Sequence, residues 1–143
     1  MYWSDTVEKY MEIAIKLAQK AAKKGEIPVG AIIVKNGKII SKAYNKKETK
    51  NDCTKHAEII AIQKASRKLK NWRLLDCEMY ITMEPCKMCA GAIEQSRISK
   101  IFYAVENSNF GNSTEIKNVE IIKGMCEKES KKLLKEFFKK KRS

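Results

Sequence analysis

Apolar side chains recur every three or four positions in the first segment of the chain, which is the spacing of one helix face. These positions are Val7, Ile13, Ile15, Leu17 and Ala21. Ser4 or Asp5 can cap the start, Glu8 lies in the first turn, and Gly25 ends the pattern. The pattern therefore predicts an amphipathic helix that stops before Gly25.

Two apolar runs, 29–34 and 38–44, flank the dipeptide Asn36-Gly37. Asn-Gly between two such runs is the strongest short-range hairpin signal, so two antiparallel strands are expected after the first helix. Residues 56–69 are rich in Ala, Ile, Gln and Lys and predict a second helix. Residues 77–83 predict the strand that follows it.

The second half of the chain continues this alternation of helices and strands. Pro85 suits the first turn of a third helix, because a first-turn residue needs no amide hydrogen. The remaining expected elements are a helix over 85–95, a strand over 98–105, a loop over 106–118, a short strand over 119–122 and an amphipathic helix over 126–140. The 143 residues fit one domain, 1–143, of the α/β class.

The balance of charge is strongly basic, with 30 Lys+Arg against 17 Asp+Glu and a formal net charge of +13. Such a surface attracts an anionic partner such as nucleic acid. A lysine-rich genome composition would equally explain the same excess without any binding role, so both interpretations stay open. The five cysteines are an odd number with no even disulfide framework, and no N-terminal hydrophobic signal precedes them, so a reducing cytoplasm is expected. No apolar run approaches the roughly 18 residues of a membrane span.

Two short motifs carry the candidate chemistry. The only histidine lies in His56-Ala57-Glu58, and the second motif is Pro85-Cys86-Lys87-Met88-Cys89. One imidazole and two thiols make three metal ligands, and a catalytic zinc keeps its fourth position for water or substrate. Cys-x-x-Cys alone would equally suit a redox pair. The added histidine and its neighbouring glutamate favour a catalytic metal.

The expected positions of these residues suit such a centre. Cys86 and Cys89 are three residues apart, so they share one face at the start of a helix, where the helix dipole favours thiolates. A metal held there lowers the pKa of water. Glu58 is not needed as a ligand and can carry a proton from that water to a ring nitrogen and then to a departing amine. Hydrolytic deamination is therefore expected, and this pair of motifs is the known signature of zinc-dependent base deaminases.

With these motifs the chain resembles the zinc-dependent cytidine and deoxycytidylate deaminase superfamily and, within it, the bacterial tRNA adenosine deaminases. Similar blocks run through most of the chain, namely Glu26-Ile27-Pro28-Val29-Gly30-Ala31, Asn45, Asn71-Trp72-Arg73-Leu74, Glu84 with the cysteine motif, and Ser96-Arg97-Ile98. The resemblance implies a three-layer α/β/α cytidine deaminase-like fold with a five-stranded mixed sheet flanked by helices. It also implies a homodimer that converts the wobble adenosine of a tRNA anticodon loop to inosine.

The resemblance also assigns roles to individual residues. His56, Cys86 and Cys89 would hold one Zn²⁺ per subunit, and Glu58 would move protons. The residues expected to bind the substrate are Asn45, Pro28, Val29, Gly30, Ala57, Asn107 and Phe138. Asn107 stands where relatives usually have aspartate, and Phe138 suits stacking on an unstacked base. Trp72 and Phe137 are expected in the core.

Two other functions remain open from the sequence. A deaminase of free guanine, cytosine or a nucleotide would use the same scaffold and the same metal ligands. A zinc-stabilised RNA-binding module without catalytic activity would explain the metal ligands and the basic charge. The loop 106–118 is shorter than in most relatives and lacks their glycine-rich, lysine-containing segment, so the reaction type is better supported than the substrate.

Overall fold

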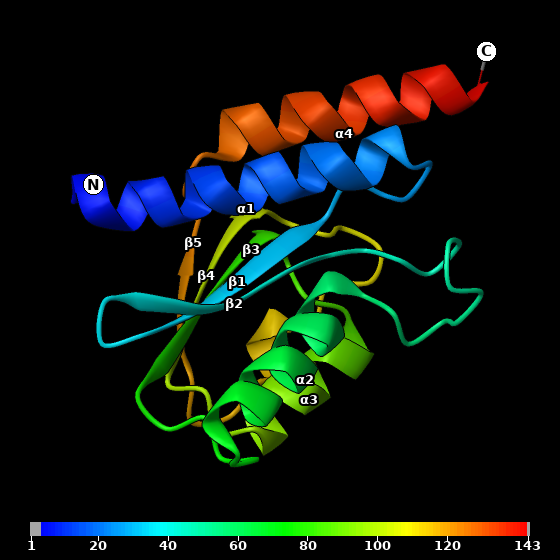
Figure 1. The fold of residues 1–143 in the computed structure, drawn as a ribbon. Coiled ribbons are helices and arrows are strands. Elements are labelled where there is room, and N and C mark those ends of the chain that lie inside the picture. The colour runs from blue at the N-terminus through cyan, green and yellow to red at the C-terminus, as the bar shows by residue number, and fades with distance from the viewer. Residues whose placement is uncertain (1–3, 143) are drawn as a thin grey trace.

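A five-stranded sheet lies between two pairs of helices in the computed structural model, which describes residues 4–142 (Figure 1). Helices α1 and α4 run side by side over one face, and α2 and α3 cover the other. The helices are α1 (Asp5–Lys23), α2 (Ala57–Leu69), α3 (Lys87–Gln95) and α4 (Glu127–Arg142), and the strands are β1 (Gly30–Lys35), β2 (Lys38–Tyr44), β3 (Cys77–Met83), β4 (Lys100–Val105) and β5 (Glu120–Lys123). The predicted three-layer α/β/α fold is confirmed.

The sheet is mixed, with the strand order β2-β1-β3-β4-β5. Strand β1 pairs antiparallel with both β2 and β3, whereas β3 with β4 and β4 with β5 are parallel. The tight turn between β1 and β2 contains Asn36 and Gly37 at φ 50° and 76°, the positive values that a two-residue hairpin turn requires. The predicted hairpin is therefore confirmed.

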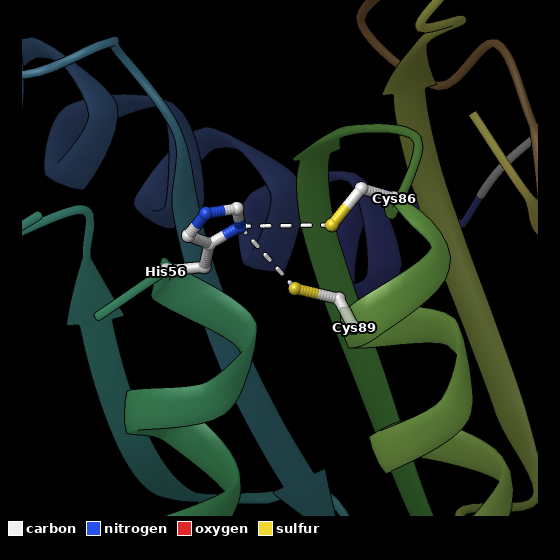
Figure 2. Close-up of side chains that lie close together, drawn as sticks. All are labelled: His56, Cys86 and Cys89. Atoms are coloured by element: carbon white, nitrogen blue, oxygen red, sulfur yellow. Dashed lines mark hydrogen bonds between the residues drawn. The ribbon is translucent and has the colours of Figure 1, made fainter. Parts of the chain in front are cut away.

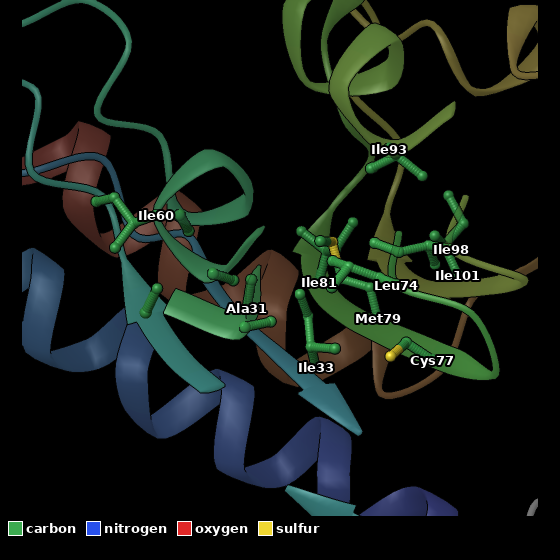
Figure 3. Packing of buried hydrophobic residues seen from close by; sticks show 14 of the residues in the cluster. Ala31, Ile33, Ile60, Leu74, Cys77, Met79, Ile81, Ile93, Ile98 and Ile101 are labelled. Carbon is green, nitrogen blue, oxygen red and sulfur yellow. The ribbon is translucent and has the colours of Figure 1, made fainter. Parts of the chain in front are cut away.

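The central strands bury both of their faces, so alternate residues enter two separate hydrophobic layers. Figure 3 shows the layer toward α2 and α3, where Ala31, Ile33, Met79, Ile81 and Ile101 lie together. Their neighbours along the strands point toward α1 and α4, namely Ile32, Val34, Tyr80, Phe102 and Ala104. This alternation explains why the strands read as continuous apolar runs in the sequence.

Most element boundaries lie within two residues of the expected ones, and two expectations need correction. Cys86 is the N-cap of α3, so Pro85 lies just before the first turn, in the segment that connects β3 to α3. Trp72 was expected in the core but is 53% exposed in the loop after α2, where the guanidinium of Arg73 lies 4.4 Å from the centre of its ring. Phe137 is buried, as predicted, and its neighbour Phe138 is half-exposed.

Three further features of the described residues bear on the expectations from the sequence. All five cysteines are free thiols. Residues 113–115 of the expected loop form a short 3-10 helix, Ser113–Glu115. Of the helices within 4–142, none combines the length and the apolar character needed to cross a membrane.

Gly30 lets α1 pack directly on the start of β1. A Cβ atom at this position would collide with the carbonyl oxygen of Ala14 and lie 2.8 Å from the backbone nitrogen of Ala18. The backbone N–H of Gly30 donates to Thr82 Oγ1 of β3 at 3.1 Å. The close approach fixes the height of α1 over the sheet and therefore the position of the segment that follows α1.

Replacing Gly30 by alanine is expected to lower the free energy of unfolding by about 3 kcal/mol, because the helix must shift to admit the methyl group. Gly91→Ala is the matched control, since a Cβ there meets nothing within 4 Å outside the helix's own backbone. That change is expected to be neutral or to stabilise by up to about 1 kcal/mol. Urea unfolding of both variants tests this, and equal effects would contradict the packing role of Gly30.

Candidate active site

Helices α2 and α3 begin side by side at the same end of the sheet, and each is capped by a candidate metal ligand. His56 is the N-cap of α2 and Cys86 is the N-cap of α3, and neither side chain makes the usual capping hydrogen bond to its own helix. Cys89 is one turn further along α3. Figure 2 shows the three side chains pointing toward one another across the gap between the two helices.

The distances between the three side chains fit one tetrahedral metal ion. His56 Nδ1 lies 3.7 Å from Cys86 Sγ and 3.5 Å from Cys89 Sγ, and all ligand atoms lie within 4.8 Å of one another. Bonds of about 2.0 Å to nitrogen and 2.3 Å to sulfur, at tetrahedral angles, would separate the nitrogen and sulfur atoms by about 3.5 Å. The donor set and its spacing could therefore hold a metal ion such as zinc.

Electrostatic coupling within this group favours a thiolate at Cys86. Contacts with Cys89 and His56 lower the pKa of Cys86 to about 3. The same contact with Cys86 raises the pKa of His56, and contact with Cys86 together with burial raises the pKa of Cys89. The negative charge therefore lies on Cys86, while His56 and Cys89 keep their protons more firmly than usual. A metal ion would have to displace the remaining protons on Cys89 and His56, so its binding would release protons.

Glu58 lies in the first turn of α2, two residues after His56, and its side chain is 4% exposed. Burial raises the pKa of Glu58 to about 7. Because this value is close to neutral pH, the carboxyl group can accept a proton and release it again at little cost. The first turn also lets His56 and Glu58 face the same cavity, as the sequence predicted.

Asn45, directly after β2, connects this site to the neighbouring backbone. Its Oδ1 accepts from the backbone N–H of Ala57 at 2.8 Å, and its Nδ2 donates to the carbonyl oxygen of Ile27 at 3.2 Å. These two bonds fix the orientation of the amide. One lone pair on Oδ1 and one N–H of Nδ2 are left for a ligand.

A cavity of about 710 Å³ opens beside these groups, and His56, Glu58 and Cys86 line it. Its wall is largely apolar, with Ile27, Val29, Met83 and Met88. The end of α4 contributes the residues Phe137, Phe138 and Lys141. A largely apolar cavity with a few convergent polar groups suits a flat heterocyclic ring.

The structure brings most of the predicted site residues to this cavity, but not all of them. The predicted residues that line it are His56, Glu58, Cys86, Asn45, Val29, Asn107 and Phe138. Cys89 is fully buried behind His56, within the ligand group. Pro28, Gly30 and Ala57 are buried and lie outside the lining, because Gly30 packs under α1 and the N–H of Ala57 is bonded to Asn45.

Glu84 is a site residue that the sequence analysis missed. Its carboxylate accepts from the backbone N–H of Asn107 at 3.1 Å, and from both the N–H at 3.1 Å and the hydroxyl at 2.5 Å of Ser113. Gly111 lies so close that a Cβ there would collide with this carboxylate. Glu84 therefore holds both ends of the loop that carries Asn107 and the exposed Phe110 to the cavity. Gly111 was the available signal in the sequence for this close contact, but its partner Glu84 is distant in the sequence.

Glu26, which also lines the cavity, plays the same part for another segment. It is 1% exposed and accepts from the backbone N–H groups of Glu48 and Thr49 at 3.1 and 2.6 Å, and from the Thr49 hydroxyl at 2.6 Å. Burial alone would raise the pKa of Glu26, but these hydrogen bonds hold it below its ordinary value of 4.5. The carboxylate thereby anchors the segment 46–55, which follows Asn45.

Comparisons with known proteins agree on one kind of enzyme. A family model described as MafB19-like deaminase matches residues 5–142. The tRNA-specific adenosine deaminase of Bacillus subtilis is 40% identical over 141 residues, covering 92% of this chain and 88% of that protein. A structure from studies of A-to-I editing by tRNA:A34 deaminases at the wobble position superposes with a TM-score of 0.85 at 32% identity, covering 88% of this chain and 99% of that one.

A guanine deaminase from Bacillus subtilis is also similar, at 39% identity with a TM-score of 0.69. This match covers 79% of the present chain and 71% of that protein. The similarity to the tRNA-specific enzyme extends over more of both chains. The scaffold is therefore shared by deaminases that act on different substrates.

Replacing Glu26 by glutamine is expected to lower the free energy of unfolding by about 2 kcal/mol at pH 7, because two backbone amides lose a charged acceptor. Since the pKa of Glu26 in the folded state lies below 4.5, its contribution is complete above that pH and is lost as the pH falls further. The difference between wild type and variant should therefore shrink as the pH falls below 4.5.

The matched control for this experiment is Glu48→Gln, in the same segment. Glu48 is exposed and its carboxylate makes a single 3.9 Å ion pair with Lys47, so its loss should cost less than about 0.5 kcal/mol. Urea unfolding across this pH range measures both variants. A Glu26→Gln effect that is constant with pH would contradict the anchoring role of the ionised carboxylate.

Proposed function

This chain belongs to the tRNA-specific adenosine deaminase family, and we propose that it hydrolyses the 6-amino group of adenosine at the wobble position of a tRNA anticodon, which leaves inosine and ammonia. The observation that carries the proposal is the arrangement of His56, Cys86 and Cys89 at one side of a largely apolar cavity, with the buried carboxyl of Glu58 beside them.

His56, Cys86 and Cys89 would hold one zinc ion, consistent with their donor types and with the distances between them. Bound there, zinc supplies a Lewis acid that activates water for attack on the electron-poor ring carbon. Glu58 takes the proton from water, delivers it to the adjacent ring nitrogen, and protonates the amine as it departs. Its pKa of about 7 suits all three transfers at neutral pH.

The remaining groups of the cavity orient the base. Asn45 offers its free lone pair and its free N–H to the polar edge of the purine, while its other two bonds keep the amide fixed. Val29 provides an apolar contact for the ring. Phe138 is 42% exposed, and it lines the cavity together with Lys141 and Asn107, so these residues would meet the nucleotides around the target.

An anticodon loop suits this site because its bases are already unstacked, so the target can enter without melting a duplex. The net charge of +13 favours such a polyanion. A role in tRNA modification would place the enzyme in the cytoplasm, and its family resemblance favours a homodimer of single-domain subunits. A deaminase of free guanine is the second candidate, because of the 39% identity to a guanine deaminase.

Incubating the protein with total tRNA and with free guanine separates these candidates. Inosine at the wobble position, without ammonia released from guanine, is the expected result. Ammonia from guanine with unchanged tRNA would contradict the proposal and favour the second candidate.

Glu58→Gln tests the catalytic role directly. The variant is expected to lose inosine formation by a factor of about 10² to 10⁴, because glutamine cannot carry a proton. Its affinity for tRNA and its zinc content should not change. Glu12→Gln on the exposed face of α1 is the control and should retain full activity. Full inosine formation by Glu58→Gln would rule out this mechanism, whereas a wild type that binds RNA but deaminates no substrate would favour an RNA-binding module.

A further inference from the structure

Three lysines converge on the ring of Tyr44, at the end of β2. Their Nζ atoms lie 5.6 Å (Lys20), 5.7 Å (Lys24) and 5.0 Å (Lys46) from the centre of the ring. Lys20 and Lys24 come from the last part of α1 and its cap, and Lys46 follows β2. These three lysines and Lys64 are called the Tyr44 cluster below.

Lys64 on α2 joins the cluster from the other side of β2. Its Nζ donates to the carbonyl oxygen of Lys42 at 2.8 Å. Burial lowers the pKa of Lys64, and the charges of Lys46, Arg67 and Lys20 lower it further. The four ammonium groups therefore share one region of positive potential.

This concentration of charge has no acidic partner within residues 4–142. None of the four ammonium groups there forms an ion pair with a carboxylate, although Lys47, Lys100 and Lys123 each do. The three groups around Tyr44 lie within about one Debye length of one another at 0.1 M salt, so they repel each other appreciably. An aromatic ring offers only two faces to cations, so cation–π attraction to Tyr44 does not account for the gathering of three lysines around it.

The residues next in sequence to two lysines of the Tyr44 cluster line the cavity. Lys24 precedes Gly25, and Lys46 lies between Asn45 and Lys47, and these three neighbours line the cavity. In Figure 1 the end of α1 and the segment after β2 lie on the same side of the molecule. Lys141 lines the cavity from α4, so positive charge reaches the opening from different elements.

We propose that the Tyr44 cluster is a binding surface for the phosphate backbone of the RNA whose base occupies the cavity. The proposal rests on the proposed function for the identity of that RNA as tRNA. The cluster contains cations without acidic partners, close together and next to the opening, which is the arrangement that a polyanion neutralises on binding with release of its counterions. The cluster holds the RNA while the cavity holds the base.

An anionic membrane fits the cluster less well. A membrane-binding surface combines cations with apolar side chains that enter the lipid. Tyr44, the aromatic residue at the centre of the cluster, is 9% exposed and covered by the lysines. Binding of RNA phosphates requires only the cations and no apolar side chain at the surface.

The test compares two variants of the full chain that carry the same net charge. The first neutralises the cluster with Lys20→Gln, Lys24→Gln, Lys46→Gln and Lys64→Gln. The second is a control at exposed lysines of other regions, with Lys9→Gln, Lys38→Gln, Lys68→Gln and Lys128→Gln. Fluorescence anisotropy measures the Kd for labelled tRNA between 50 and 300 mM KCl, and the circular dichroism spectrum checks the fold.

The cluster variant is expected to bind tRNA at least about tenfold more weakly than the control variant at 0.1 M salt. The slope of log K against log salt should become shallower by about 2 or more, since each lost phosphate contact contributes roughly 0.7 to 0.9. Its KM for tRNA should rise while kcat is unchanged. Equal weakening in both variants would overturn the proposal, as would selective loss of binding to phosphatidylserine vesicles.

If the four changes disturb the fold, the pair Lys20→Gln and Lys24→Gln, at exposed positions of α1 and its C-cap, serves instead, against Lys9→Gln and Lys128→Gln. Inosine formation by the wild type is scored separately. A wild type that modifies tRNA but shows no difference between the variants would refute the Tyr44 cluster alone. A wild type without activity whose tRNA binding depends on the cluster would refute only the proposed function.

Discussion

The meeting of two helix N-termini at one end of the sheet is the constraint on which the site depends. Helix α2 follows β2 and helix α3 follows β3, and both cover the same face, so their first residues become neighbours although 30 positions separate them in the sequence. His56 and the two cysteines approach to within 3.5 and 3.7 Å only because of this packing. The same first turn of α2 brings Glu58 to the cavity.

The two helices lose some local stability at their N-termini, because their caps are candidate metal ligands that make no capping hydrogen bond. Serine, threonine, aspartate or asparagine would cap a helix about 1 kcal/mol better than a side chain that makes no capping bond. His56 and Cys86 occupy the two caps without such a bond, and the carboxyl of Glu58 is buried nearby. The two hydrophobic layers of the sheet compensate, because they fix β1, β3 and β4 from both faces. Two further carboxylates, Glu26 and Glu84, then hold the flanking loops in place.

The helices and strands could be predicted from the sequence because the signals for each of them lie in neighbouring residues. The Asn36-Gly37 turn, the apolar runs of the strands and the spacing of Cys86 and Cys89 need no knowledge of distant residues. The roles of Glu26 and Glu84 were missed because each depends on backbone amides more than 20 positions away. Trp72 was misplaced because its exposure depends on the path of the loop after α2. The Tyr44 cluster was likewise invisible, since its lysines come from three separate elements.

The most direct test of this account is the metal centre itself. Zinc K-edge absorption spectroscopy on the purified protein, with the metal content measured in parallel, reports the number and type of ligating atoms. The account predicts one zinc per chain, bound by two sulfur atoms and one imidazole nitrogen of the protein, with the remaining position open to solvent or substrate. A fourth protein ligand in the first shell, or protein that is active with no metal, would contradict it.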